Sequence, residues 1–350
     1  MKESFSDTPT TRIQLDNYGF AGMDASQLGA IKSAADYYQI PVTATQIYGM
    51  TGLAFLFVID ENLVQPNAGP PEPEIFRLAR NIGLEIEGFH QYAEGVTFSK
   101  LQSEAWEKAR MAINSNKPVF AKNLGQDNQT SVIIAYDSIG YYIDSWHTGY
   151  EHSQEVIPWN LLGLVHCPCM NCANERKIAE PRDSTSGLIS LHWADTAPSL
   201  DEMTAFKEAL QFAIRLNDDG SYKWSGKMYF VGSRAFEEWI NGFERNNVYK
   251  FDFALIIEVV NEARYQAILF LADIKDKLNG KLKQSVDEAI MTYTEISSRC
   301  NTLKSRFPYE QPRELFNDTE TEDIIAILRE ISMLERKALT YLKEMYVALS

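Results

Sequence analysis

The sequence predicts an α+β fold, with an antiparallel sheet in the N-terminal part and an α-helical C-terminal region. Up to about residue 197, short apolar runs alternate with turn residues, which is typical of antiparallel strands. Beyond Pro198, longer segments carry apolar residues at helical spacing instead. Because domains usually hold about 100–200 residues, a chain of 350 residues is expected to form two.

The elements before the sheet are expected to be mostly helical. In chain order they are a helix over 24–39, a short helix over 43–48, a buried strand over 53–59, and helices over 74–82 and 98–115. Asp24 or Ser26 is the expected N-cap of the first helix, because a short polar side chain accepts a hydrogen bond from the unpaired N–H groups there. Pro41 breaks this helix, since proline has no N–H to donate.

The strands of the sheet are expected between residues 118 and 193. The apolar runs that predict them lie at 118–122, 131–136, 140–145, 162–166 and 188–193. A short polar turn separates the second run from the third, so these two are expected to form an antiparallel hairpin. The polar range 171–186 is expected to be a loop.

Helices are expected to fill the rest of the chain. They are predicted over 200–217, 234–245, 253–278, 284–304 and 319–348. Their apolar stripes are wide, and the long ones lack sustained heptads, so a packed bundle is expected rather than an extended coiled coil. A long amphipathic terminal helix often joins two copies of a chain, which makes a homodimer one expectation.

The charge of the chain excludes two classes of partner. Lys and Arg number 33 against 48 Asp and Glu, giving a formal net charge of −15. Such a chain repels nucleic-acid phosphates and anionic membrane surfaces. No apolar run reaches the roughly 18–20 residues of a membrane helix, and residues 1–12 have no signal-peptide pattern. With only four cysteines and no disulfide framework, a cytoplasmic protein is expected.

Several segments resemble one known family. They are Asp-Tyr-Tyr at 36–38, Ile-Tyr-Gly-Met-Thr-Gly-Leu-Ala-Phe at 47–55, the hairpin at 132–136 and 141–146, and the helical stretch at 261–271. The family resembled is named after butirosin biosynthesis protein H, whose N-terminal domain has a helix ending in Tyr-Tyr-Gly, a Gly-rich turn and an apolar strand ending in Phe. The resemblance implies that residues 15–197 form a papain-like domain. The sequence pattern predicts a flexible arm over 1–14 before it and a helical domain over 198–350 after it.

The resemblance also implies a type of chemistry. Papain-like acyltransferases place a Cys at the N-terminus of the first helix, a His at the start of a strand, and an Asp or Asn on the next strand. The protein that names the family moves an aminoacyl group from a carrier protein to an aminoglycoside amine. In this chain the nucleophile position falls at Ser26, the His position falls at 129–131 where no His occurs, and the third position falls at Asp144.

Two functional hypotheses follow from this departure. A serine hydroxyl without a base is a weak nucleophile, so the first hypothesis is a pseudoenzyme, a non-catalytic or altered papain-like protein. It would act as a binding or accessory protein in bacterial specialised metabolism, with a small-molecule or acyl-carrier ligand. The alternative is an acyltransferase or hydrolase that uses Ser26, with Asp144 and a substitute base at His147, to move an acyl or aminoacyl group from a carrier thioester to an amine. In simpler interpretations Ser26 caps a helix, Asp144 makes a strand-end hydrogen bond and His147 is solvated.

A second group of side chains indicates a metal. His166, Cys167, Cys169 and Cys172 offer four ligands in a short stretch, and zinc takes four such ligands in a tetrahedron. His192 could complete the site from a neighbouring strand. The alternatives are a reduced loop without a metal and a thiol pair that forms a disulfide on oxidation. No other cofactor is expected.

Overall fold

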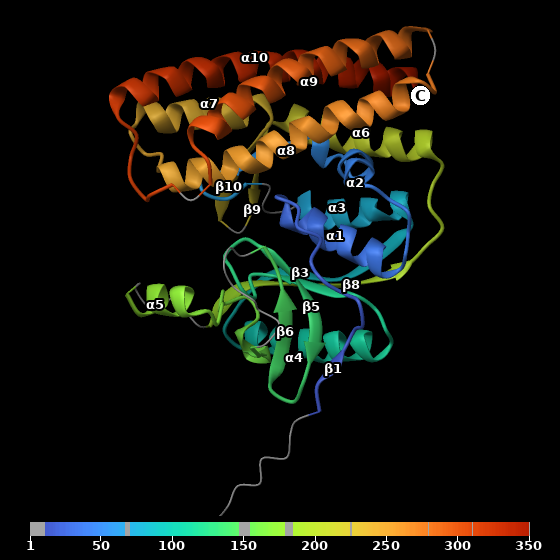
Figure 1. Cartoon of the computed structure of the whole chain (residues 1–350), viewed down its shortest axis with the longest axis vertical. Coiled ribbons are helices and arrows are strands. Elements are labelled where there is room, and N and C mark those ends of the chain that lie inside the picture. The colour runs from blue at the N-terminus through green and yellow to red at the C-terminus, as the bar shows by residue number, and fades with distance from the viewer. Residues whose placement is uncertain are drawn as a thin grey trace, which may run out of the picture. The chain divides into compact units, whose positions relative to one another are not determined.

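The chain folds into two compact units. The computed structural model describes residues 11–66, 71–146, 155–178, 185–224, 226–278, 280–309 and 311–349 (Figure 1). Unit 1 comprises Met1–Ile40 and Ile86–Thr196, and unit 2 comprises Pro41–Glu85 and Ala197–Ser350. The sequence analysis assigns residues 41–85 to the N-terminal domain, whereas in the structure they belong to unit 2.

The predicted α+β class, with an antiparallel sheet, is confirmed in unit 1. In the part of the chain that the structure describes, seven strands form a sheet in the order β3–β8–β4–β5–β6–β7, and β1 pairs with β5. The pairs β4–β5, β4–β8, β5–β6 and β6–β7 are antiparallel. The strands are β1 (Ile13–Gln14), β3 (Leu84–Glu94), β4 (Val119–Lys122), β5 (Thr130–Tyr136), β6 (Gly140–Asp144), β7 (Ile157–Pro158) and β8 (Ser186–Thr196).

Helices of unit 1 cover this sheet. α4 (Gly95–Asn114) packs against β8 and β4, and α1 (Ser26–Tyr37) packs against β5. Trp106 of α4 contacts the rings of Tyr136 and Tyr141 edge-on, with centroids 5.7 and 5.0 Å away. Aromatic pairs of this geometry stabilise a core beyond the area they bury. The 3₁₀ turn η4 (Trp159–Leu161) and the helix α5 (Met170–Ile178) follow the strand β7.

Unit 2 is mainly helical, which confirms the expected helical C-terminal region. The long helices α8, α9 and α10 pack side by side, and β2, β10 and β9 form a small antiparallel sheet (Figure 1). The elements are α2 (Ala44–Met50), η1 (Leu53–Phe55), β2 (Val58–Asp60), α3 (Pro71–Leu78), η2 (Ala79–Ile82), α6 (Glu202–Asp219), β9 (Ser221–Trp224), β10 (Lys227–Val231), α7 (Ser233–Glu244), α8 (Lys250–Lys275), α9 (Gly280–Arg306) and α10 (Asp318–Ala348).

Packing against α8 explains why residues 41–85 belong to unit 2. Gly49 of α2 lies so close to the ring of Phe270 that an added Cβ atom would stand 2.2 Å from it. Arg264 of α8 donates hydrogen bonds to the carbonyl oxygens of Ala54 and Leu56, at 2.9 and 3.0 Å. These contacts join segments more than 200 positions apart, so local sequence patterns do not show them.

The first described residues pair with the sheet of unit 1. Residues 1–10 of the expected arm lie outside the described residues, and Ile13–Gln14 form β1 against Tyr136 and Ala135 of β5.

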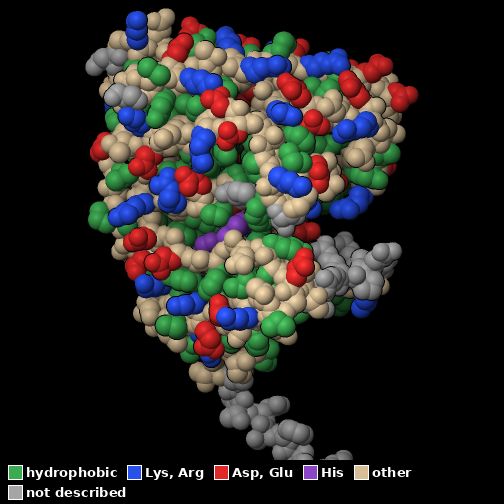
Figure 2. Space-filling model, turned by 180° about the vertical axis from the view of Figure 1, so that it is seen from behind, with side chains coloured by type: hydrophobic (Ala, Val, Ile, Leu, Met, Phe, Trp, Pro, Cys, Tyr) green, Lys and Arg blue, Asp and Glu red, His purple; other side chains and the backbone are tan. Residues whose placement is uncertain are grey.

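Figure 2 shows acidic and basic side chains interspersed over one face of the molecule. Among the described helices, none has both the length and the apolar character that crossing a bilayer requires.

Candidate functional site

Ser26 is the first residue of α1, and its side chain is tied to the sheet. The N-cap of the helix is Ala25, which makes no side-chain capping bond, so the expected capping role of Ser26 is wrong. The Ser26 hydroxyl instead accepts a hydrogen bond from the backbone N–H of Thr130, at 3.0 Å. Ser26 is only 6% exposed, and Thr130 is the first residue of β5. The side chain therefore links the start of the helix to the start of the strand.

Asp144 also makes a structural hydrogen bond. It is the last residue of β6 and lies opposite Val132, two positions along β5 from Thr130. Its Oδ2 atom accepts a hydrogen bond from the backbone N–H of Phe20, at 2.9 Å. The ring of Phe20 in turn lies against Gly29 of α1. Asp144 thus holds the segment that precedes α1 against the end of β6.

The proposed base is not part of this arrangement. His147 lies outside the described residues. Within the described part of the chain, the hydrogen-bond partner of the Ser26 hydroxyl is the Thr130 amide and not an imidazole. His192 of β8 is buried and stacks on Phe120, with ring centroids 5.6 Å apart. Burial and the nearby His90 lower the pKa of His192 to about 3, so its imidazole stays neutral.

Sequence reasoning missed a buried lysine next to Thr130, the hydrogen-bond partner of Ser26. Lys122 ends β4, is almost completely buried, and lies opposite Thr130 on β5 and Ser190 on β8. A lysine that closes an apolar run looks like an ordinary strand end in the sequence. Its burial comes from the pairing of β4 on both sides, which is a property of the sheet order rather than of the local pattern.

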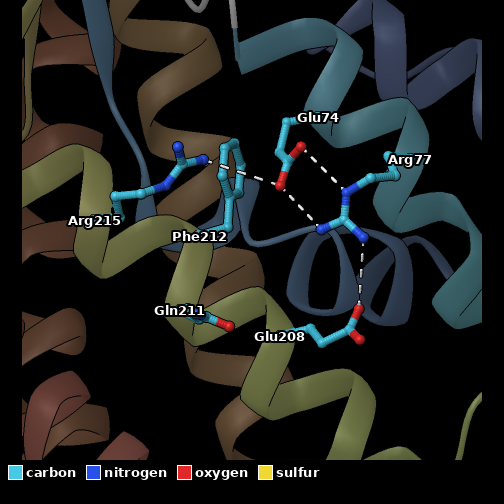
Figure 3. A pocket seen from close by; sticks show the side chains of 6 residues that line it. All are labelled: Glu74, Arg77, Glu208, Gln211, Phe212 and Arg215. Carbon is cyan, nitrogen blue, oxygen red and sulfur yellow. Dashed lines mark hydrogen bonds and ion pairs between the residues drawn. The ribbon is translucent and has the colours of Figure 1, made fainter.

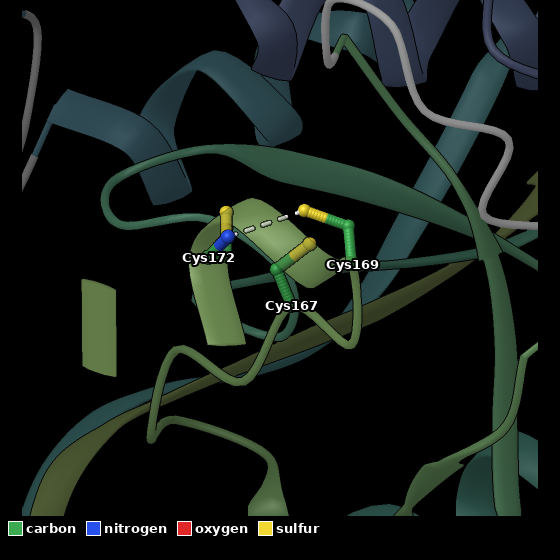
Figure 4. A group of neighbouring side chains, drawn as sticks. All are labelled: Cys167, Cys169 and Cys172. Atoms are coloured by element: carbon green, nitrogen blue, oxygen red, sulfur yellow. Dashed lines mark hydrogen bonds between the residues drawn. The ribbon is translucent and has the colours of Figure 1, made fainter. Parts of the chain in front are cut away.

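Three cysteines meet at the start of α5. Cys167 and Cys169 precede this helix and Cys172 lies in its first turn. Their sulfur atoms all lie within 4.8 Å of one another and face a common space (Figure 4). His166 is described, but its ring does not join this group, and neither does that of His192. The structure therefore brings together three of the four predicted ligands.

Two of the three cysteines are shielded from solvent. Cys167 and Cys169 are buried, and burial raises the pKa of the Cys167 thiol well above its ordinary value. Without a metal, Cys167 is therefore protonated near neutral pH. The backbone N–H of Cys172 donates to the Cys169 sulfur at 3.4 Å, a weak bond that favours the thiolate. Three converging thiols of this kind could hold a metal ion.

One loop connects the cysteine segment with the start of β5. The backbone N–H groups of Val165 and His166 donate to the carbonyl oxygens of Asn123 and Leu124, at 3.1 and 2.9 Å. Asn123 in turn donates its N–H to the carbonyl oxygen of Gln129, at 3.1 Å. The backbone N–H of the next residue, Thr130, donates a hydrogen bond to the Ser26 hydroxyl. The two candidate sites of unit 1 are thus joined through the loop 123–129.

Comparison with known proteins adds no relative to this description. No protein-family model and no curated protein matches the chain.

Unit 2 contains a charged pocket between α3 and α6, shown in Figure 3. The Glu74 carboxylate lies between the guanidinium groups of Arg77 and Arg215, at 2.9 and 3.9 Å. Arg77 also lies 4.0 Å from Glu208. The hydrogen bonds that the Arg77 guanidinium donates to the Glu74 carboxylate raise the pKa of Arg77. Because each guanidinium already has a carboxylate partner, this pocket is best explained as a network that ties α3 to α6.

Proposed function

We propose that the chain is a non-catalytic or altered member of the papain-like family named after butirosin biosynthesis protein H. In this proposal it serves as a binding or accessory protein in bacterial specialised metabolism. The hydrogen bond from the Thr130 N–H to the Ser26 hydroxyl carries the proposal. At the position of the family nucleophile the chain has Ser26, a buried serine whose oxygen already accepts a hydrogen bond.

The relative placement of three elements supports the resemblance. In papain-like enzymes the nucleophile begins a helix, the histidine begins a strand, and the third group lies on the next strand. Here Ser26 begins α1, Thr130 begins β5, and Asp144 ends β6, the neighbour of β5. The scaffold positions are therefore near one another in unit 1, while the side chains on them are not those of the usual catalytic set.

The chemistry of these side chains favours binding over turnover. A serine must lose its proton to become a strong nucleophile, and a positioned base typically contributes about 10²–10⁴-fold in rate. Ser26 has an amide donor as its partner and Asp144 accepts from the Phe20 amide. Both side chains therefore support the packing of α1 and do not form a catalytic pair. In this proposal unit 1 binds a ligand without transforming it.

Intact-protein mass spectrometry tests this proposal. The purified chain and its Ser26→Ala and Ser26→Cys variants are incubated with an acyl-pantetheine thioester, and thioester hydrolysis is followed in parallel. We expect no acyl adduct and no hydrolysis above background for the native chain and for Ser26→Ala. A rise in thermal midpoint on adding the thioester, without an adduct, would support binding of that ligand class.

The opposite result would establish the alternative function. An adduct of the acyl mass on the native chain, absent from Ser26→Ala, would show that Ser26 is a working nucleophile. The chain would then be an acyltransferase or hydrolase, and a panel of amines would identify the acceptor. Ser26→Cys is the matched control for scaffold competence, since a thiol is intrinsically more reactive at the same position.

The three-cysteine group favours a second role, and we infer that it holds zinc. Zinc binds cysteine thiolates at about 2.3 Å, and a tetrahedral arrangement needs sulfur atoms a little under 4 Å apart. Sulfur atoms within 4.8 Å of one another reach that spacing through small side-chain rotations. In a small loop of a reducing compartment, such a cluster is more often a metal site than a disulfide.

Metal analysis of the purified protein tests the zinc assignment. We expect about one zinc ion per chain in the native protein, and loss of the ion from Cys167→Ala and Cys169→Ala. Cys300→Ala is the matched control, because Cys300 is also buried but lies in α9 and outside the group. Retention of zinc in Cys167→Ala, or its absence from the native protein after purification and zinc reconstitution, would reject the assignment.

A further inference from the structure

We propose that the zinc ion held by Cys167, Cys169 and Cys172 keeps one coordination position for an exogenous ligand, and that this ligand is a small-molecule thiol. The inference rests on the zinc assignment of the proposed function and goes beyond it by naming what the site binds. It makes the cysteine group a binding site rather than only a structural clamp.

The number of ligands carries the first step. Zinc takes four ligands, and sites with three protein ligands leave the fourth to water or substrate. Among the described residues, three cysteines converge and no further His, Asp or Glu side chain joins them. His166 is the neighbour of Cys167 in the chain, yet its ring nitrogens lie outside the group.

The burial of the three cysteines shows where the open position lies. Cys167 and Cys169 are buried, whereas Cys172 is half-buried. Met170, between them in the chain, is 74% exposed. Two ligands therefore anchor the ion in the protein and the third stands at the solvent boundary. An external molecule would reach the ion from the side of Cys172.

Charge and softness decide the class of ligand. Zinc with three thiolates has a net charge of −1, so it withdraws less charge from a bound water than zinc on three neutral imidazoles does. Hydroxide is accordingly disfavoured, and a neutral water in the fourth position exchanges readily. Sites already rich in thiolate favour further sulfur donors over hard oxygen donors. A thiol is therefore the ligand that fits best.

The binding step is a ligand exchange without oxidation or reduction. The S–H bond of the thiol breaks and its proton passes to the buffer. A Zn–S bond forms, the Zn–O bond to water breaks, and the water leaves. The site would thereby hold a small thiol as its thiolate near neutral pH, although the free thiol is mostly protonated there.

Cobalt substitution provides the experiment, because the sulfur-to-cobalt absorption of Co²⁺ grows with the number of bound thiolates. The native chain, kept reduced with a phosphine, is loaded with Co²⁺ and titrated with cysteamine. We expect a three-thiolate spectrum that gains about one-third in sulfur-to-cobalt intensity on saturation. Ethanolamine, which replaces the thiol by a hydroxyl, is the matched control and should leave the spectrum unchanged.

The possible results separate this inference from the zinc assignment. A Co²⁺ spectrum that cysteamine does not change would overturn the open position while leaving the metal site intact. A loss of Co²⁺ absorption intensity or a band shift in His166→Ala, before any thiol is added, would identify His166 as the fourth ligand and also overturn it. Failure of the chain to bind either Co²⁺ or Zn²⁺ would reject both proposals together.

Discussion

The guanidinium of Arg264 and the carboxylate of Glu335 form an ion pair that is closed off from solvent inside unit 2. Their Nε and Oε1 atoms are 2.6 Å apart, and the two side chains are 0% and 4% exposed. Arg264 also holds the carbonyl oxygens of Ala54 and Leu56. A single side chain of α8 thus joins α10 to η1 and its C-cap residue, Leu56.

Replacing Arg264 by Met should be strongly destabilising. The change leaves the Glu335 carboxylate buried without a partner and removes the donors to two carbonyl oxygens, which costs about 3–5 kcal/mol. Urea unfolding measures the difference. The matched control is Arg299→Met at the Arg299–Glu330 pair, which has the same 2.6 Å separation but side chains 30% and 52% exposed. That change should cost about 0–1 kcal/mol.

A double replacement distinguishes pairing from packing. Arg264→Met combined with Glu335→Leu removes both charges, so it should cost less than Arg264→Met alone. Equal losses in the single and the double variant would show that the Arg264 contacts to the carbonyl oxygens, not the ion pair, dominate. A cost of Arg264→Met below about 1 kcal/mol would contradict the closed environment that we describe.

Gly49→Ala should destabilise unit 2 although alanine is the better helix former. The added methyl would stand 2.2 Å from the Phe270 ring, so α2 must move away from α8. Overpacking of this kind costs about 1–3 kcal/mol, against a gain in helix propensity of about 1 kcal/mol. Thermal unfolding gives the net effect. Phe270→Leu in the Gly49→Ala background should recover part of the loss, and a rise in stability of Gly49→Ala would contradict the close packing.

Sequence patterns predicted the long helices and the central hairpin well. The helices expected over 253–278 and 319–348 appear as α8 and α10, because an apolar stripe at helical spacing persists over many turns. The strands expected at 131–136 and 140–145 appear as β5 and β6, because a polar turn separates two apolar runs.

Elements whose structure depends on distant partners were not predictable. β3 was missed because most of its side chains are not buried, so no apolar alternation marks it. The strand expected over 53–59 begins as the 3₁₀ turn η1 after Gly52, whose positive φ of 78° suits glycine, and only its end forms β2. The range 171–186, predicted as a loop, contains most of α5. The side chains of this helix are mostly polar, so no apolar stripe marks it in the sequence.

The candidate site shows the same division. Sequence proximity sufficed to predict that Cys167, Cys169 and Cys172 meet, since a loop and one helical turn bring them together. It could not show that the ring of His166 lies outside the group, because that depends on a single side-chain torsion. The link between Ser26 and Thr130 spans 104 positions, so the local pattern indicated a helix cap instead.

His192 should make the stability of the chain depend on pH in the mildly acidic range. Its pKa is about 3 in the folded chain, against an ordinary value of 6.5, because the ring is buried and His90 lies nearby. Below pH 6.5 the unfolded chain binds a proton here that the folded chain does not. The free energy of unfolding therefore falls as the pH falls, by at most about 1.4 kcal/mol per pH unit.

The slope between about pH 7 and 5 is the quantity to measure, because carboxylates contribute little of the change there. His192→Asn should flatten this slope even if it lowers the absolute stability. The measurement is chemical unfolding at several pH values for both proteins. An unchanged slope in the variant would show that another group binds the proton on unfolding.

Removing the metal should loosen a defined part of unit 1. The cysteine segment is held to the loop 123–129 by the N–H groups of Val165 and His166, and that loop leads to Thr130 and Ser26. If zinc fixes Cys167 and Cys169, chelation lets this segment open locally. Hydrogen exchange of the Val165 and His166 amides should then speed up by roughly tenfold or more, which corresponds to about 1.4 kcal/mol of local stability.

Peptides from α9 and α10 serve as the internal control and should exchange as before. Faster exchange that extends to the Thr130 amide would show that the metal also supports the hydrogen bond to Ser26. Unchanged exchange at Val165 and His166 would contradict a structural effect of the metal on this loop.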